Sequence, residues 1–168
     1  MAKIKLKKWQ EAIEDWFGEY ESYSGSETMQ SFSQYDINKK SSLNVKMADG
    51  AGHTFLTSYL SINLPLKYKT SPVVVVYFDV DHLREIESRQ EDIVEDFQCL
   101  PEKPVFMSVY ELYYAINENM HSSDGLKIQR AKSKINGNIV VVDKASQLPN
   151  TVRDFILTVA TNAVVFLG

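Results

Sequence analysis

The chain has 168 residues, of which 44% are hydrophobic and 24% charged, and its formal net charge is −4. The length suits a single domain, residues 1–168, and the composition is that of a folded protein rather than a disordered one. The negative net charge argues against a general attraction to nucleic acid. The single cysteine, Cys99, excludes an internal disulfide, and no apolar run reaches the ~20 residues of a membrane span, so we expect a cytoplasmic protein with no membrane partner.

The first half of the chain predicts a helix followed by several strands. Apolar residues three and four positions apart predict an amphipathic helix from about residue 7, on a stripe formed by Trp9, Ala12, Ile13, Trp16, Phe17 and Tyr20. From about residue 30 the period becomes two, which predicts two strands joined by a turn at residues 38–41. The serine, threonine and tyrosine content of residues 55–64 favours another strand, with a short helix as the alternative, and Pro65 ends it.

The second half predicts alternating strands and helices around one very apolar segment. Residues 73–78 are almost entirely apolar and β-branched, as in a strand covered on both faces. Helices are expected over residues 83–97, from the capping-box pair Ser108 and Glu111, and from residue 150. Short strands are expected at residues 126–130 and 139–142. The fold class is therefore mixed α/β, with one mixed sheet, a central apolar strand at about residues 72–79 and helices on both faces.

Asp79 and Asp81 directly follow the apolar strand and form one candidate site. Metals and phosphates often bind where buried strands end at the carboxyl edge of a sheet, so both carboxylates are candidate metal ligands. The alternative is that aspartate here caps the free N–H groups of the next helix.

The segment YDINKKSSLNVKM, followed by PVVVVYF, offers a second candidate site. A helix, a hairpin carrying an aspartate and then a lysine, and an apolar strand together resemble restriction-endonuclease-like nucleases of the PD-(D/E)XK class. The resemblance implies that Asp36 binds Mg²⁺ or Mn²⁺ and that Lys46 is the catalytic lysine. Asn44 stands where the family has an acidic residue, and an amide is a poorer magnesium ligand. A four-residue turn would pair Asp36 with Leu43, on the opposite face from Lys46.

The predicted helix over residues 83–97 and the abundant tyrosines point instead to binding. Five carboxylates form a candidate partner-binding face, with a merely solvated helix face as the alternative: Glu87, Glu91, Asp92, Glu95 and Asp96. The nine tyrosines cannot all lie inward, and exposed tyrosines are effective anchors at protein interfaces. The three histidines lack metal-binding spacing, so each is expected at the surface or at a helix cap.

No complete catalytic motif occurs in the chain. The favoured hypothesis is a non-catalytic protein without a cofactor that binds a macromolecular partner, another protein, with a nucleic acid as an alternative that the net charge does not support. Immunity or inhibitor proteins and accessory proteins of phages or mobile elements are of this kind. The alternative is a metal-dependent nuclease, or a degenerate relative, of the PD-(D/E)XK class.

Overall fold

A computed structural model describes residues 5–22, 33–37, 40–46, 52–68, 72–94, 100, 102–121 and 125–168. Its strands are β1 (Ser33–Ile37), β2 (Lys40–Val45), β3 (Val74–Tyr77), β4 (Val105–Ser108), β5 (Val140–Asp143) and β6 (Val164–Leu167). Its α-helices are α1 (Lys8–Ser22), α2 (His53–Tyr68), α3 (Val80–Ile93), α4 (Val109–His121), α5 (Leu126–Ile135) and α6 (Asn150–Val159), and a short 3₁₀ helix, η2, spans Ala145–Gln147.

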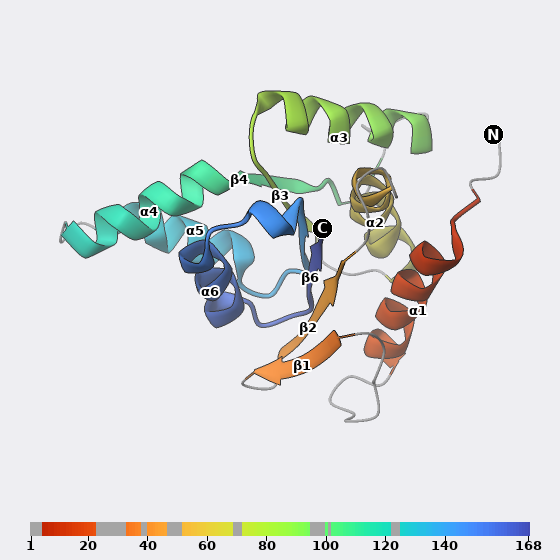
Figure 1. Ribbon diagram of the computed structural model, residues 1–168, viewed down its shortest axis with the longest axis horizontal. Helices are drawn as coiled ribbons and strands as arrows, with labels where there is room; N and C mark the ends of the chain where they lie inside the picture. Colours follow the sequence, from red (N-terminus) through yellow and green to blue (C-terminus); the bar gives the residue numbers. More distant parts are fainter. Residues whose placement is uncertain are drawn as a thin grey trace.

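The strands form one mixed sheet in the order β1-β2-β6-β5-β3-β4 (Figure 1). β1 is antiparallel to β2, and all the other neighbouring pairs are parallel. Helices lie on both faces, which confirms the predicted fold class. The apolar strand β3 is interior, between β5 and β4.

Alternate residues of the interior strands supply two separate cores. Val75 of β3 and Val73, just before it, pack into a cluster with α1 and α2, whereas Val74 and Val76 pack into a cluster with α4, α5 and α6. Since successive side chains of a strand point to opposite faces, an uninterrupted apolar run is what a doubly covered strand requires. Helix α3 packs mainly against α2, so it forms an outer layer on the first face.

The prediction of a strand over residues 55–64 is wrong, because these residues belong to helix α2. Leu56, Leu60 and Leu64 share the spacing of one helical stripe and are buried in the first core. Serine side chains fold back onto the helix itself: the Ser58 Oγ donates to the Thr54 carbonyl at 3.0 Å. The burial of the leucines outweighs the strand preference of the segment, and the serine hydroxyl is satisfied within the helix. Pro65 lies inside the helix rather than ending it.

The prediction of a strand at residues 126–130 is also wrong. These residues open helix α5, which begins after Gly125 in a left-handed conformation, with φ of 58°, and buries Ala131 and Ile135 four positions apart. Strands β4 and β6 were not predicted. Strands β4 and β6 are each only four residues long. Because β6 follows closely after the apolar end of α6, hydrophobic periodicity does not distinguish the strand from the helix.

Within the described residues, every helix is too short or too polar to cross a membrane.

Candidate functional site

The carboxyl ends of β3 and β5 form the switch point of the sheet. From β3 the chain passes through α3 to β4 on one side, and it later returns as β5 on the other side of β3. Ligands of open α/β sheets bind in the crevice outside such a point. Four polar residues gather there, and we call them the edge cluster: Thr54, Asp79, His82 and Asp143.

Asp79 caps helix α3. Its Oδ1 accepts the backbone N–H of His82 at 2.8 Å, the bond expected of an N-cap carboxylate. Asp81 is exposed in the first turn of the same helix, where a negative charge is favourable beside the free N–H groups. Helix capping, the alternative interpretation of the sequence, therefore describes what Asp79 does.

His82 is buried, with 2% of its surface exposed, although the sequence suggested a surface or capping position. Its Nδ1 accepts the backbone N–H of Phe78 at 3.0 Å, and its Nε2 lies 2.8 Å from the Asp143 Oδ2. A backbone N–H only donates, so the pattern assigns the ring proton to Nε2, which donates to Asp143. Both ring nitrogens are therefore occupied, and neither can take a proton from a substrate in this arrangement.

Asp143, the last residue of β5, is the centre of the edge cluster and is fully buried. Its Oδ2 also accepts the Thr54 hydroxyl at 2.7 Å, and its Oδ1 accepts the backbone N–H of Lys144 at 3.0 Å. The carboxylate thereby joins the start of α2, the start of α3 and the end of β5. A buried carboxylate needs such donors to offset its desolvation. Sequence reasoning missed Asp143, although it follows an apolar strand much as Asp79 does.

The hairpin that carries the nuclease-like residues has a different register from the one predicted. Asp36 pairs with Ser41 and Ile37 with Lys40, so only residues 38 and 39 connect the strands, and the predicted pairing of Asp36 with Leu43 is wrong. The side chain of Asp36 lies outside the described part of the structure. Lys46 is exposed just beyond the end of β2.

Asn44, at the position that is acidic in the nuclease family, contacts a cationic side chain. Its Oδ1 accepts a hydrogen bond from the Arg153 Nη1 at 2.9 Å, and the guanidinium of Arg153 lies 4.3 Å from the centre of the Phe166 ring. The amide oxygen that would have to replace a metal-binding carboxylate is thus engaged by an arginine. Nowhere in the described ranges do three or more His, Cys, Asp or Glu side chains group as a metal site would require.

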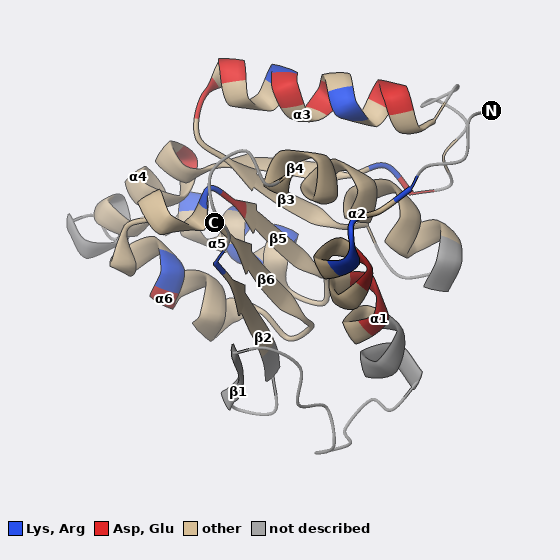
Figure 2. Cartoon of the chain, turned by 45° about the vertical axis from the view of Figure 1, so that its right-hand side comes forward, with Lys and Arg blue, Asp and Glu red and all other residues tan. Residues whose placement is uncertain are grey.

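The part of the predicted acidic face that the structure describes lies on α3, which ends at Ile93 rather than at the predicted residue 97. Glu87, Glu91 and Asp92 are exposed there. Arg89 lies between Glu87 and Glu91 in the sequence and Arg84 precedes them, so the helix shows alternating acidic and basic bands (Figure 2). Glu95 and Asp96 fall outside the described residues.

Exposed aromatic residues instead gather on α4. Tyr110 and Tyr114 are 58% and 60% exposed, and Tyr113 is 40% exposed. Helix α4 buries Leu112 and Ala115 on its inner stripe, which leaves the three tyrosines on the outer side. The Tyr113 and Tyr114 rings meet edge to face, with centroids 6.1 Å apart.

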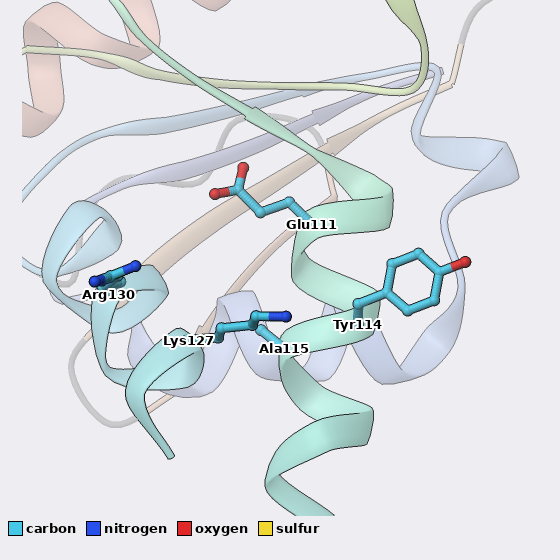
Figure 3. Close-up of a pocket in the computed structure, with 5 residues that line it drawn as sticks. All are labelled: Glu111, Tyr114, Ala115, Lys127 and Arg130. Carbon is cyan, nitrogen blue, oxygen red and sulfur yellow. The ribbon is translucent and has the colours of Figure 1, made fainter. Parts of the chain in front are cut away.

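A pocket of about 480 Å³ lies between α4 and α5, lined by Glu111, Tyr114, Ala115, Lys127 and Arg130. Figure 3 shows the Lys127 side chain extending towards α4, while the Tyr114 ring points away from α5. The exposed Leu126 lies at the start of α5. We call this region the α4–α5 surface: Tyr110, Tyr113, Tyr114, Leu126, Lys127 and Arg130.

No protein-family model matches the chain, and no curated protein matches it in sequence. A functional conclusion therefore depends on the edge cluster and the α4–α5 surface themselves.

Proposed function

We propose that this protein binds another protein through the α4–α5 surface. The observation that carries the proposal is the set of three exposed tyrosines on one helix, of which Tyr114 also lines a pocket with Lys127 and Arg130. Tyrosine and arginine are enriched among the residues that contribute most to protein interfaces, because each buries a large area and also forms polar contacts.

The packing of α4 gives a reason to regard these tyrosines as functional. The helix is held by its inner stripe and by the Ser108 cap, whose Oγ accepts the Glu111 backbone N–H at 2.9 Å. The outer positions need no aromatic residue for this packing, and small polar or charged residues are usual there. Exposed apolar area that the fold does not require is typical of binding surfaces.

The edge cluster supports a non-catalytic role. The polar atoms of Thr54, His82 and Asp143 that could do chemistry are hydrogen-bonded to one another or to the backbone. A catalytic group must reach a substrate atom within hydrogen-bond distance, and His82 and Asp143 are buried. The proposed role is that of a small cytoplasmic immunity, inhibitor or mobile-element accessory protein.

Affinity capture from extracts of the source cell tests the proposal. We expect the native chain to recover a stoichiometric protein partner, and the double variant Tyr110→Ser/Tyr114→Ser to lose it, because most binding energy comes from a few aromatic anchors. The matched control is Asp79→Asn/Asp81→Asn, which changes two exposed residues at the switch point and should retain the partner. Failure to recover any partner, or equal recovery by the tyrosine variant, would contradict the proposal.

The nuclease alternative makes a separate prediction. If Asp36 and Lys46 form an active centre, the chain will cut plasmid DNA with Mg²⁺ or Mn²⁺, and both Asp36→Ala and Lys46→Ala will abolish the cutting. We expect no metal-dependent cutting. Cutting that both substitutions abolish would favour the nuclease.

A further inference from the structure

We propose that the partner places an arginine side chain beside Tyr77, at the corner where strands β3 and β4 pass into helices α3 and α4. We call this region the Tyr77 corner: Tyr77, Glu87, Phe106 and Glu111. The inference rests on the proposed function, because it concerns the same partner, and it adds the chemical group that the partner presents.

The Tyr77 corner contains an aromatic pair on the sheet itself. Tyr77 is the last residue of β3, and Phe106 lies on the neighbouring strand β4. The two rings meet edge to face, with centroids 6.4 Å apart. Both side chains are only partly buried, and helix α3 packs mainly against α2 rather than over this end of the sheet. The rings therefore retain exposed surface that a ligand can contact.

Two carboxylates on different helices flank this aromatic pair. Ser108 pairs with Tyr77 across the strands, and its Oγ accepts the Glu111 backbone N–H at 2.9 Å, which brings Glu111 close to Tyr77. Glu87 approaches from α3. Burial raises the pKa of the Tyr77 phenol most, and the negative charges of Glu111 and then Glu87 raise it further. Both carboxylates therefore lie within electrostatic reach of the phenol.

The described residues leave the negative charge of the corner largely uncompensated. In this part of the chain Glu87 forms no ion pair, although Arg84 lies one turn before it on α3. Glu111 forms one, with the Lys134 Nζ at 3.3 Å from its Oε1, but both side chains are exposed. Exposed ion pairs contribute little, so this pair leaves Glu111 able to attract a second cation.

Aromatic rings beside carboxylates favour a guanidinium as the ligand. Arginine is attracted to the faces of tyrosine and phenylalanine rings, and its planar group also forms directed hydrogen bonds to carboxylates. A lysine ammonium is more strongly hydrated and gains less from contact with a ring. Tyr110 directly precedes Glu111 on α4. The corner is thus continuous with the tyrosines of the proposed interface, and one partner can contact both.

Fluorescence anisotropy with defined probes tests the inference. The first probe is a labelled peptide in which arginine alternates with leucine; two others replace arginine with lysine or with glutamate. We expect saturable binding of the arginine peptide, tighter than that of the lysine peptide and weaker at high salt. Glu87→Lys should weaken it about tenfold or more, since like charges then face each other.

Glu85→Lys is the matched control. It makes the same change of charge at an exposed position of the same helix, but Glu85 is not one of the carboxylates that raise the pKa of Tyr77. We expect it to change the affinity by less than about threefold. The ring is tested separately: Tyr77→Phe should stay within about twofold of the native chain, whereas Tyr77→Leu should weaken binding about threefold or more.

Three outcomes would overturn the inference. These are no saturable binding of the arginine peptide, equal weakening by Glu85→Lys and Glu87→Lys, and tighter binding of the glutamate peptide. Thermal unfolding checks each variant, and the comparison of the two exposed glutamates decides the matter even where Tyr77→Leu does not fold. The proposed function fails separately: a captured partner that needs Tyr110 and Tyr114 but tolerates Glu87→Lys would retain the function and reject the arginine.

Discussion

The edge cluster and the α4–α5 surface use their polar residues in opposite ways. At the edge cluster, His82 and Asp143 are buried and hydrogen-bonded between elements far apart in sequence. On the α4–α5 surface, Tyr110 and Tyr114 remain exposed, although the packing of α4 does not require them there. The histidine and the carboxylate with the greatest capacity for chemistry therefore lie in the interior, while the exposed side chains of α4 are aromatic.

The difference has an energetic basis. A buried carboxylate is tolerated only with nearly complete hydrogen bonding, and removing its partners leaves unsatisfied groups that cost about 1–3 kcal/mol each. An exposed tyrosine contributes little to folding, so its substitution is tolerated by the monomer. Stability measurements should therefore separate the two regions even before the partner is known.

The largest expected effect is at Asp143. Asp143→Ala leaves the His82 Nε2–H and the Thr54 hydroxyl unpaired in the interior, so we expect the free energy of unfolding to fall by about 3 kcal/mol or more. Urea unfolding followed by circular dichroism measures this. Asp154→Ala, at an exposed position of α6, is the control and should stay within about 0.5 kcal/mol of the native chain. Equal losses of stability in Asp143→Ala and Asp154→Ala would show that the edge cluster does not stabilise the fold.

Two threonines on α2 give the next comparison. Thr54→Val removes a hydrogen bond to the Asp143 carboxylate and should cost about 1.5–3 kcal/mol, as for bonds to charged groups. The hydroxyl of Thr57 is buried without a hydrogen-bond partner among the described residues, so Thr57→Val should be neutral or stabilising. In urea unfolding, the same change on one helix should thus be costly at Thr54 and without cost at Thr57. A larger loss at Thr57 than at Thr54 would contradict the assigned hydrogen bonds.

On the α4–α5 surface the effect on stability should be small. Each of Tyr110→Ser and Tyr114→Ser should change the free energy of unfolding by about 0.5 kcal/mol or less, because both side chains are largely exposed. Leu112→Ala, on the buried stripe of the same helix, should cost about 2–5 kcal/mol. Tyrosine substitutions as costly as Leu112→Ala would mean that the rings serve folding rather than binding.

The smallest effect concerns alkaline pH. Burial raises the pKa of the Tyr77 phenol above its usual value of about 10, and the carboxylates of Glu111 and then Glu87 raise it further. The unfolded chain therefore loses this proton first, so the contribution of Tyr77 to stability is complete below about pH 10 and is lost as pH rises through the folded pKa. Tyr77→Phe should flatten the decline of stability above about pH 10, and Glu111→Gln should do so in part. Identical pH profiles would contradict the assigned environment.

The sequence predicted those parts of the fold whose side-chain pattern is determined locally. Strand β3 is apolar at every position, and the stripe of α1 that includes Trp16 and Phe17 repeats every three or four residues, so both were identified correctly. Helix α2 was predicted only as the alternative to a strand, because its serine and threonine content favours strands, while the side chains of Ser58 and Ser61 in fact bond to the helix backbone. The short strands β4 and β6 depend on pairing with neighbours distant in sequence.

The site residues, too, were predictable where their contacts are local in sequence and not where the contacts are distant. The capping role of Asp79 depends on a residue three positions away and was foreseen as an alternative. The bond between His82 and Asp143 joins residues 61 positions apart, which only the folded sheet brings together. Surplus tyrosine was recognised as an interface signal, but its position on α4 became clear only when the helix showed which residues it buries.

Amide hydrogen exchange of the captured complex, compared with the free chain, tests the central claim most directly. The account predicts slower exchange in α4 (Val109–His121) and α5 (Leu126–Ile135), and unchanged exchange at the β3–α3 turn and in η2. Protection confined to that turn and η2, with α4 and α5 unaffected, would place the binding site at the switch point and contradict the account.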